Sequence, residues 1–247
     1  MNLLENKTAL ITGAARRIGA QTARTLHENG ANLIIHYHQS AKEAENLTDE
    51  LNHQRTDSAI SLSADLQLLD AINQLAENAI QAFDGLDLLI NNASGFYPTK
   101  LGEISESDWD ELMGSNIKAP LFLSQACYPA LKNSKGQIIN MVDIHARQPL
   151  KDHTIYCCAK AANAMLVRSL AKEMAPEVRV NGVAPGAILW PQDENELDTD
   201  TQQKILKNIP LAKTGNPKNI ADTILFLANN DYINGQIIAV DGGRQLF

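Results

Sequence analysis

The chain has 247 residues, of which 44% are hydrophobic and 20% are charged, and its formal net charge is −8 at pH 7. This length and apolar content suit one large α/β domain or two small ones, with ample core. The acidic balance argues against a protein that tracks nucleic-acid phosphates, because such proteins carry a basic stripe. No apolar run approaches the roughly 20 residues that a membrane-spanning helix needs.

The N-terminus and the cysteines indicate the compartment. The first residues, MNLLENKTALITG, lead directly into a strand-like run and lack the basic region and long apolar core of a secretory signal. Cys127, Cys157 and Cys158 are odd in number and two are adjacent, which fits neither a disulfide framework nor a zinc site. We therefore expect reduced thiols that serve packing in a cytoplasmic protein, with no bound metal.

Strand-like and helical patterns alternate along the whole chain. We expect strands at residues 7–12, 31–38, 58–65, 86–93, 137–143, 178–185 and 236–243. We expect helices at 14–30, 40–54 with Ser40 as N-cap, 67–83, 106–133 with an interruption near Pro120, 153–175, 200–208 and 217–229. The alternation predicts right-handed crossovers and a parallel seven-stranded sheet covered on both faces. We therefore predict a single doubly wound, Rossmann-type α/β domain over residues 1–247.

Residues with chemical potential gather where the predicted strands end. In doubly wound sheets, ligands bind beyond the carboxyl ends of the strands, at the switch in strand order. The residues at such ends are Gly13, His36, Asp65, Asn92, Asp143 and Pro185.

The segment TGAARRIG, residues 12–19, connects the first strand to the first helix, which is the place of a dinucleotide phosphate loop. Glycines let the backbone approach a pyrophosphate, and the helix N-terminus favours negative charge. Only Gly13 and Gly19 are present, and Arg17 stands at the usual position of a middle glycine. A plain strand-to-helix turn with two surface arginines is the alternative.

The second strand distinguishes between cofactors. An NAD-binding fold places an acid here for the ribose 2′-hydroxyl, but this strand ends in His36-Tyr37-His38-Gln39-Ser40. A 2′-phosphate would be favoured by Arg17, by the histidines and by Ser40. The segment therefore predicts NADPH, and the alternative is a run of solvent-facing polar residues.

Tyr156 and Lys160 are four residues apart, on one face of the predicted helix. An ammonium beside a phenol favours the phenolate and lowers the pKa of the tyrosine, which is one route to a proton donor near neutral pH. An amphipathic helix whose lysine reaches out to water is the alternative.

Together these motifs resemble the short-chain dehydrogenase/reductases over effectively the whole chain. The matching residues are Thr12-Gly13 with Gly19, Asn91-Asn92-Ala93, Asn116, Tyr156 with Lys160, and Pro185-Gly186. Within that family TGAARRIG, HYHQS and NNASGFYPT resemble the pteridine reductases. So does Asp143, thirteen residues before Tyr156, where most members have serine.

The resemblance implies NADPH-dependent reduction of a C=N bond in a pterin, with biopterin, dihydrobiopterin or a dihydrofolate-like ring as substrate, by a homotetramer. It implies a catalytic set of Asp143, Tyr156, Lys160 and Asn116. The cofactor-binding residues that it implies are Gly13, Arg17, Ile18, His36, Tyr37, His38, Gln39, Ser40, Asp65, Leu66, Asn92, Ala93, Ser94, Met141, Tyr156, Lys160, Pro185 and Gly186. The substrate-binding residues are Arg17, Ser94, Phe96 stacked on the pterin, Asp143, Tyr156 and Trp190, with a substrate lid around residues 187–210. Packing in the core is the alternative role for Trp190.

Two residues depart from the pteridine reductase pattern. Gln39 replaces a frequent arginine and removes one charge from the expected phosphate site, and Gly95 replaces a serine. Both changes bear on cofactor preference and on the substrate loop.

Asp143 favours a pterin over a carbonyl substrate. A serine donates to a ketone oxygen, whereas a carboxylate accepts from the N–H groups that pterins present. A second anion would also raise the pKa of Tyr156, so we hypothesise that Asp143 keeps the phenol protonated and favours reduction. Two other readings stay open, an NADPH-dependent carbonyl or 3-oxoacyl-thioester reductase and a non-catalytic NADPH-binding regulatory protein.

Overall fold

The computed structural model describes residues 3–190 and 198–246. Seven strands form one parallel sheet in the order β3-β2-β1-β4-β5-β6-β7, which confirms the predicted doubly wound fold. The strands are β1 Thr8–Ile11, β2 Asn32–Tyr37, β3 Ala59–Ser63, β4 Leu88–Asn91, β5 Gln137–Met141, β6 Arg179–Pro185 and β7 Ile237–Val240. Strand order reverses between β1 and β4, so the two loops that follow these strands border the expected ligand site.

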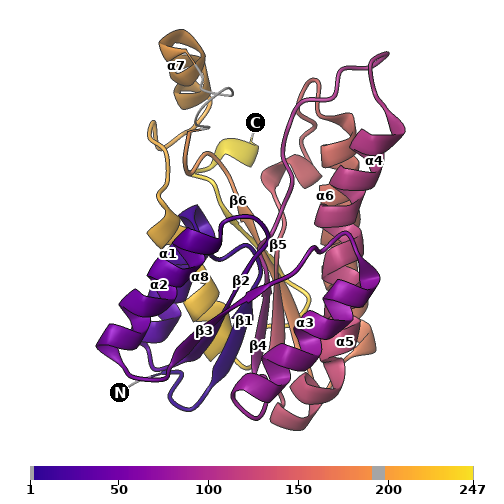
Figure 1. Cartoon of the computed structure of the whole chain (residues 1–247). Helices are drawn as coiled ribbons and strands as arrows, with labels where there is room; N and C mark the ends of the chain where they lie inside the picture. The colour runs from indigo at the N-terminus through magenta and orange to yellow at the C-terminus, as the bar shows by residue number, and fades with distance from the viewer. Residues whose placement is uncertain (1–2, 191–197, 247) are drawn as a thin grey trace.

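Helices cover both faces of the sheet, with α1, α2 and α8 on one side and α3, α5 and α6 on the other (Figure 1). They are α1 Arg17–Glu28, α2 Ala41–Gln54, α3 Leu69–Ala82, α4 Glu106–Met113, α5 Ala119–Ser134, α6 Thr154–Glu173, α7 Thr199–Lys207 and α8 Pro217–Asn229. Helix α7 projects beyond the carboxyl ends of the strands (Figure 1). Within residues 3–190 and 198–246, no helix combines the length and the apolar content needed to cross a bilayer.

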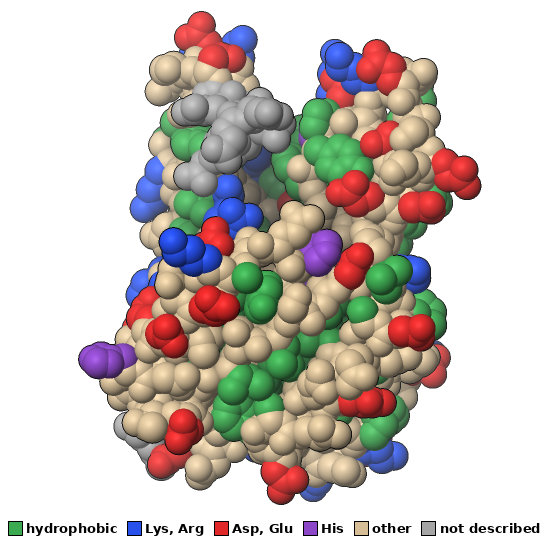
Figure 2. Space-filling model, in the orientation of Figure 1, with side chains coloured by type: hydrophobic (Ala, Val, Ile, Leu, Met, Phe, Trp, Pro, Cys, Tyr) green, Lys and Arg blue, Asp and Glu red, His purple; other side chains and the backbone are tan. Residues whose placement is uncertain are grey.

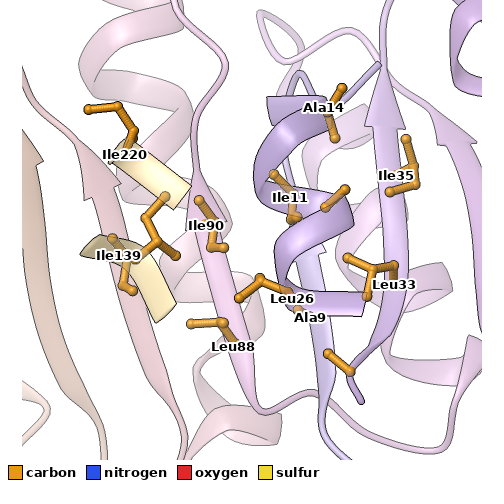
Figure 3. Close-up of a cluster of buried hydrophobic side chains, with 14 of the residues drawn as sticks. Ala9, Ile11, Ala14, Leu26, Leu33, Ile35, Leu88, Ile90, Ile139 and Ile220 are labelled. Carbon is orange, nitrogen blue, oxygen red and sulfur yellow. The ribbon is translucent and has the colours of Figure 1, made fainter. Parts of the chain in front are cut away.

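Two apolar clusters, one on each face of the sheet, explain why the central strands are apolar without a break. Neighbouring residues of a strand point to opposite faces, so Ala9 and Ile11 pack in one cluster while Leu10 packs in the other. Figure 3 shows the first cluster, where Leu26 of α1 and Ile220 of α8 lie over the strand side chains. Because both faces are covered, every residue of β1 and β4 is buried.

The interruption of the long helical segment falls just before Pro120. Residues Gly114–Lys118 form a π-helical turn, η1, between α4 and α5. Pro120 lies in the first turn of α5, where a missing N–H costs little. The predicted interruption is therefore the π-helical turn, which contains Asn116.

Ser40 is the N-cap residue of α2 as predicted, but its side chain makes no capping hydrogen bond. The backbone of Ser40 has φ −90° and ψ 55°, outside the extended region that aims a capping oxygen at the first-turn N–H groups.

Candidate active site

The predicted site lies at the carboxyl ends of β1, β4 and β5. Figure 2 shows the molecule hollowed there between two projecting lobes, one carrying α7 and the other the loop before α4. The described residues that carry the chemistry come from separate loops and helices, so the sheet acts as their common support.

Asp143 and Tyr156 are brought together as predicted. Asp143 follows β5, and its Oδ1 accepts a hydrogen bond from the backbone N–H of His145 at 2.8 Å. The hydroxyl of Tyr156, in the first turn of α6, donates to Oδ2 of Asp143 at 2.8 Å. Both carboxylate oxygens are engaged, and this fixes the plane of the carboxylate beside the phenol.

Burial raises the pKa of Tyr156 well above its usual value, and the Asp143 charge and hydrogen bond raise it further. The lowered pKa of Tyr156 that was expected from Lys160 is therefore wrong. The Lys160 ammonium lies 5.6 Å from the ring centroid of Tyr156 and donates to a backbone carbonyl instead. The phenol is protonated at neutral pH, the state that our hypothesis for Asp143 requires.

Lys160 is buried below the site. Its Nζ donates to the carbonyl of Met141 at 2.9 Å. Burial lowers the pKa of Lys160 to about 8, although the Asp143 charge opposes this. An ammonium carries three donors, and the Met141 carbonyl takes one, so Lys160 has capacity to bind the hydroxyls of a ligand.

Asn116 connects the π-helical turn to the loop after β4. Its Nδ2 donates to the carbonyl of Gly95 at 3.0 Å and to that of Leu112 at 2.9 Å. Its Oδ1 accepts from the hydroxyl of Ser94 at 2.8 Å. π-Helical turns often occur at functional sites, and here the turn aims a buried amide at the start of the predicted substrate loop.

Phe96 stands at the mouth of the site with 48% of its surface exposed. Its ring stacks on His153, with centroids 4.8 Å apart and planes 21° apart. It meets the Tyr156 ring nearly at right angles, at 4.9 Å and 76°. The exposed part of the ring is available for stacking on a flat ligand.

His153 was not singled out from the sequence. The available signal was its spacing, because a ring three residues before Tyr156 shares its helix face. Two further bonds hold the loop around Phe96. Tyr97 donates to Glu111 Oε2 at 3.3 Å, and the Thr99 N–H donates to the Asp152 carbonyl at 2.6 Å.

His36 supports the phosphate loop from within the protein. Its Nδ1 accepts from the Gly13 N–H at 3.0 Å, so Nε2 carries the proton and donates to the Ala64 carbonyl at 3.1 Å. Burial lowers the pKa of His36 to about 4, which keeps the ring neutral. The structure therefore places His36 beneath the loop, and the exposed His38 is the histidine free to face a phosphate.

Arg17 has the backbone geometry of the glycine it replaces, with φ at 54°. The loop around it is closely packed, because a Cβ on Gly19 would lie 2.5 Å from the Gly13 carbonyl oxygen. Asn92 Nδ2 fastens the loop to β4 through the carbonyls of Thr12 and Gly13, at 2.8 and 3.0 Å. Arg17 thus adopts the left-handed backbone that favours glycine.

The Arg17 guanidinium also reaches the segment expected to form a lid. Its Nη2 donates to the Trp190 carbonyl at 3.4 Å. Residues 191–197 of the predicted lid lie outside the described residues, and α7 forms most of the remainder. The other predicted cofactor residues lie in the first turn of α1, at or just after the ends of β2, β3, β5 and β6, or beside Ser94. They are Ile18, Tyr37, Gln39, Ser40, Asp65, Leu66, Ala93, Met141, Pro185 and Gly186.

The fold and the Asp143–Tyr156–Lys160 arrangement define a nicotinamide-dependent type of Rossmann enzyme, and comparison with known proteins gives the family. The family model described as enoyl-(acyl carrier protein) reductase matches residues 13–245. The chain belongs to the short-chain dehydrogenase/reductases.

Individual relatives differ in their named substrates. Pteridine reductase 1 of Leishmania tarentolae is 35% identical, with 96% of each chain covered, which confirms the resemblance to that group. The 3-oxoacyl-(acyl-carrier-protein) reductase FabG of Staphylococcus epidermidis is 33% identical over 98% of this chain and all of its own. A blue fluorescent protein from a metagenomic library, solved in complex with NADPH, has a TM-score of 0.91 at 31% identity and 99% coverage of each chain.

Proposed function

We propose that the protein is an NADPH-dependent pteridine reductase that reduces biopterin, dihydrobiopterin or a dihydrofolate-like ring to the tetrahydro form, one double bond of the ring for each NADPH. The observation that carries this proposal is the Asp143–Tyr156 hydrogen bond of 2.8 Å beside the exposed ring of Phe96. A carboxylate accepts from pterin N–H groups, and the aromatic ring stacks on the pterin.

The residues that would surround the 2′-phosphate of the cofactor suit NADPH. The described end of β2 has no carboxylate, while Arg17, the exposed His38 and the N-terminus of α2 offer positive charge and donors to a 2′-phosphate. The Asp65 carboxylate lies 4.0 Å from the His38 imidazole. Lys160 would hold the hydroxyls of the nicotinamide ribose. The blue fluorescent protein, whose structure matches this chain with a TM-score of 0.91, was solved in complex with NADPH.

The chain's own residues would bind the ring and supply the proton. Reduction of C=N adds a hydride to carbon, which NADPH supplies when bound, and a proton to nitrogen. Tyr156 holds a proton at neutral pH because burial and Asp143 raise its pKa. As that proton moves to the ring nitrogen, the Lys160 ammonium stabilises the phenolate, and water restores the proton.

A second candidate is a 3-oxoacyl-thioester reductase, because FabG is almost as similar to the chain and is covered in full. Asp143 weakens this candidate. An ionised carboxylate accepts hydrogen bonds but donates none, so it would face a ketone oxygen with repulsion.

We also propose that residues 187–210 form a lid over the substrate. The support comes from the described parts, where Arg17 binds the Trp190 carbonyl and α7 rises beside the hollow (Figure 2). Homotetramer formation, which the family resemblance implies, is checked by light scattering of the purified protein.

The test is NADPH oxidation with biopterin, dihydrobiopterin, dihydrofolate and acetoacetyl thioester as separate substrates. We expect turnover with a pterin, loss of turnover in Tyr156→Phe, and retained NADPH binding in that variant. Turnover of the thioester without any pterin activity would establish the second candidate. Tight NADPH binding without turnover of any substrate would indicate a regulatory protein.

A further inference from the structure

Three buried asparagine side chains form one line of hydrogen bonds that ends at the backbone of Asn116. Asn91 Nδ2, at the end of β4, donates to Asn140 Oδ1 of β5 at 2.8 Å. Asn140 Nδ2 donates to Asn163 Oδ1 of α6 at 2.9 Å. Asn163 Nδ2 donates to the carbonyl oxygen of Asn116 at 2.9 Å. All four residues are at most 4% exposed.

Every amide in this line donates toward Asn116, and this fixes the orientation of the Asn163 amide. Because Asn140 donates to Asn163 Oδ1, the Nδ2 of Asn163 must face the Asn116 carbonyl. Rotating that amide by half a turn would set two donors against each other and two acceptors against each other. Each buried polar group left without a partner is costly, so the Asn116 carbonyl, which can only accept, and the Asn140 amide together fix this orientation.

The carbonyl that receives the bond has lost its usual helical partner. In an α-helix the carbonyl of Asn116 would accept from the N–H of residue 120. That residue is Pro120, which has no N–H. Asn163 supplies a donor from the neighbouring helix at the point where the helix changes to a π-helical turn.

We propose that Asn163 is a positioning residue for the active site and acts through Asn116. By holding the Asn116 carbonyl, it sets the π-helical turn that aims the Asn116 amide at Ser94 and at the Gly95 carbonyl. Those contacts fix the start of the loop that carries Phe96. The inference rests on the proposed function for its kinetic consequence, but its structural part is independent of the substrate.

The test compares Asn163→Leu with a matched control. Asn181→Leu removes another fully buried amide, in β6, which bonds to the Ile233 carbonyl at 2.8 Å and to the Gln236 N–H at 3.0 Å. We expect faster backbone hydrogen exchange in residues 112–120 of Asn163→Leu but not of Asn181→Leu. Asn163→Asp keeps the acceptor for Asn140 and, when ionised, offers Asn116 no donor, so it provides a second variant if the leucine does not fold.

Kinetics then separate positioning from general stability. We expect Asn163→Leu to lower kcat/KM for the pterin about tenfold, with NADPH affinity unchanged. On an Asn116→Ala background the same change should cause no further loss, because both act through one group. The proposal would be overturned if the losses in kcat/KM of the two single variants multiplied in the double variant. Unchanged backbone hydrogen exchange in residues 112–120 of both Asn163 variants would overturn it as well. If the unmodified protein reduces no pterin, the proposed function fails, and the exchange comparison alone decides the role of Asn163.

Discussion

Replacing Arg17 with glycine removes a guanidinium from the phosphate loop and also relieves a backbone held at φ 54°. The two effects act on different measurements. The charge concerns NADPH affinity, whereas the backbone concerns the stability of the ligand-free protein. Arg17→Gly should therefore weaken cofactor binding while stabilising the fold.

The magnitudes follow from the geometry. A left-handed conformation costs a residue with a side chain about 1 to 2 kcal/mol of unfolding free energy. Glycine removes that cost, but it raises the entropy of the unfolded chain, which offsets about 0.4 to 1 kcal/mol of the gain. We expect a net gain in unfolding free energy of about 0.5 to 1 kcal/mol. Loss of a charged hydrogen bond to phosphate, about 1.5 to 3 kcal/mol, should raise the Kd for NADPH about 10- to 150-fold.

The neighbouring Arg16 provides the control. It has an extended backbone, φ −141° and ψ 167°, and an exposed ion pair with Glu43 at 3.8 Å. Arg16→Gly relieves no strain, so it should lower the unfolding free energy by about 0.5 to 1 kcal/mol. Urea unfolding without NADPH and fluorescence titration with NADPH measure both effects. If Arg17→Gly and Arg16→Gly lowered the unfolding free energy equally, the backbone of Arg17 would not be strained.

Three further predictions concern the candidate site. Asp143→Ser should lower the pKa of Tyr156, move the alkaline limb of the pH–rate profile to lower pH and reduce pterin turnover at least about tenfold. Phe96→Ala should raise KM for biopterin about 3- to 10-fold, while His153→Phe, which keeps the stacked pair, should leave it nearly unchanged. Burial holds the pKa of His36 at about 4 against 6.5 when unfolded, so about 3 kcal/mol of stability present above pH 6.5 should be lost as pH falls to 4. His36→Gln should flatten that loss in urea unfolding across this range.

Each of these has a contrary result. Full pterin reduction by Asp143→Ser with the same pH profile would remove the role given to the carboxylate. An unaltered KM in Phe96→Ala would end the stacking model of substrate binding. A pH dependence of stability that is the same with and without His36 would show that other groups cause it.

Much of the fold was readable from the sequence because both faces of the sheet are covered. A strand such as β4 must then be apolar throughout, and its pattern is easily recognised. Tyr156 and Lys160 were found because a four-residue spacing places them on one helix face. Asp143 was found because it ends a predicted strand and matches the pattern of the pteridine reductases.

Roles that depend on distant partners could not be read in this way. His36 looked like a phosphate ligand, but its partners Gly13 and Ala64 become neighbours only when β2 lies between β1 and β3. The amide of Asn163 likewise acquires its direction from Asn140 and from the Asn116 carbonyl, which lie in different elements. No local pattern encodes either arrangement.

The hydrogen bond between Tyr156 and Asp143 implies a condition that any productive ligand must meet. In the ligand-free protein the phenolic proton already lies between two oxygens 2.8 Å apart. A ligand that only accepts would draw this proton away and leave the carboxylate with one bond fewer in a half-buried place. A ring that offers an N–H to Asp143 replaces that bond as it takes the proton. On the proposed function the pair would therefore work as an exchange: an N–H donated to Asp143 would let Tyr156 pass its proton to the ring, so one contact would serve both substrate selection and proton transfer.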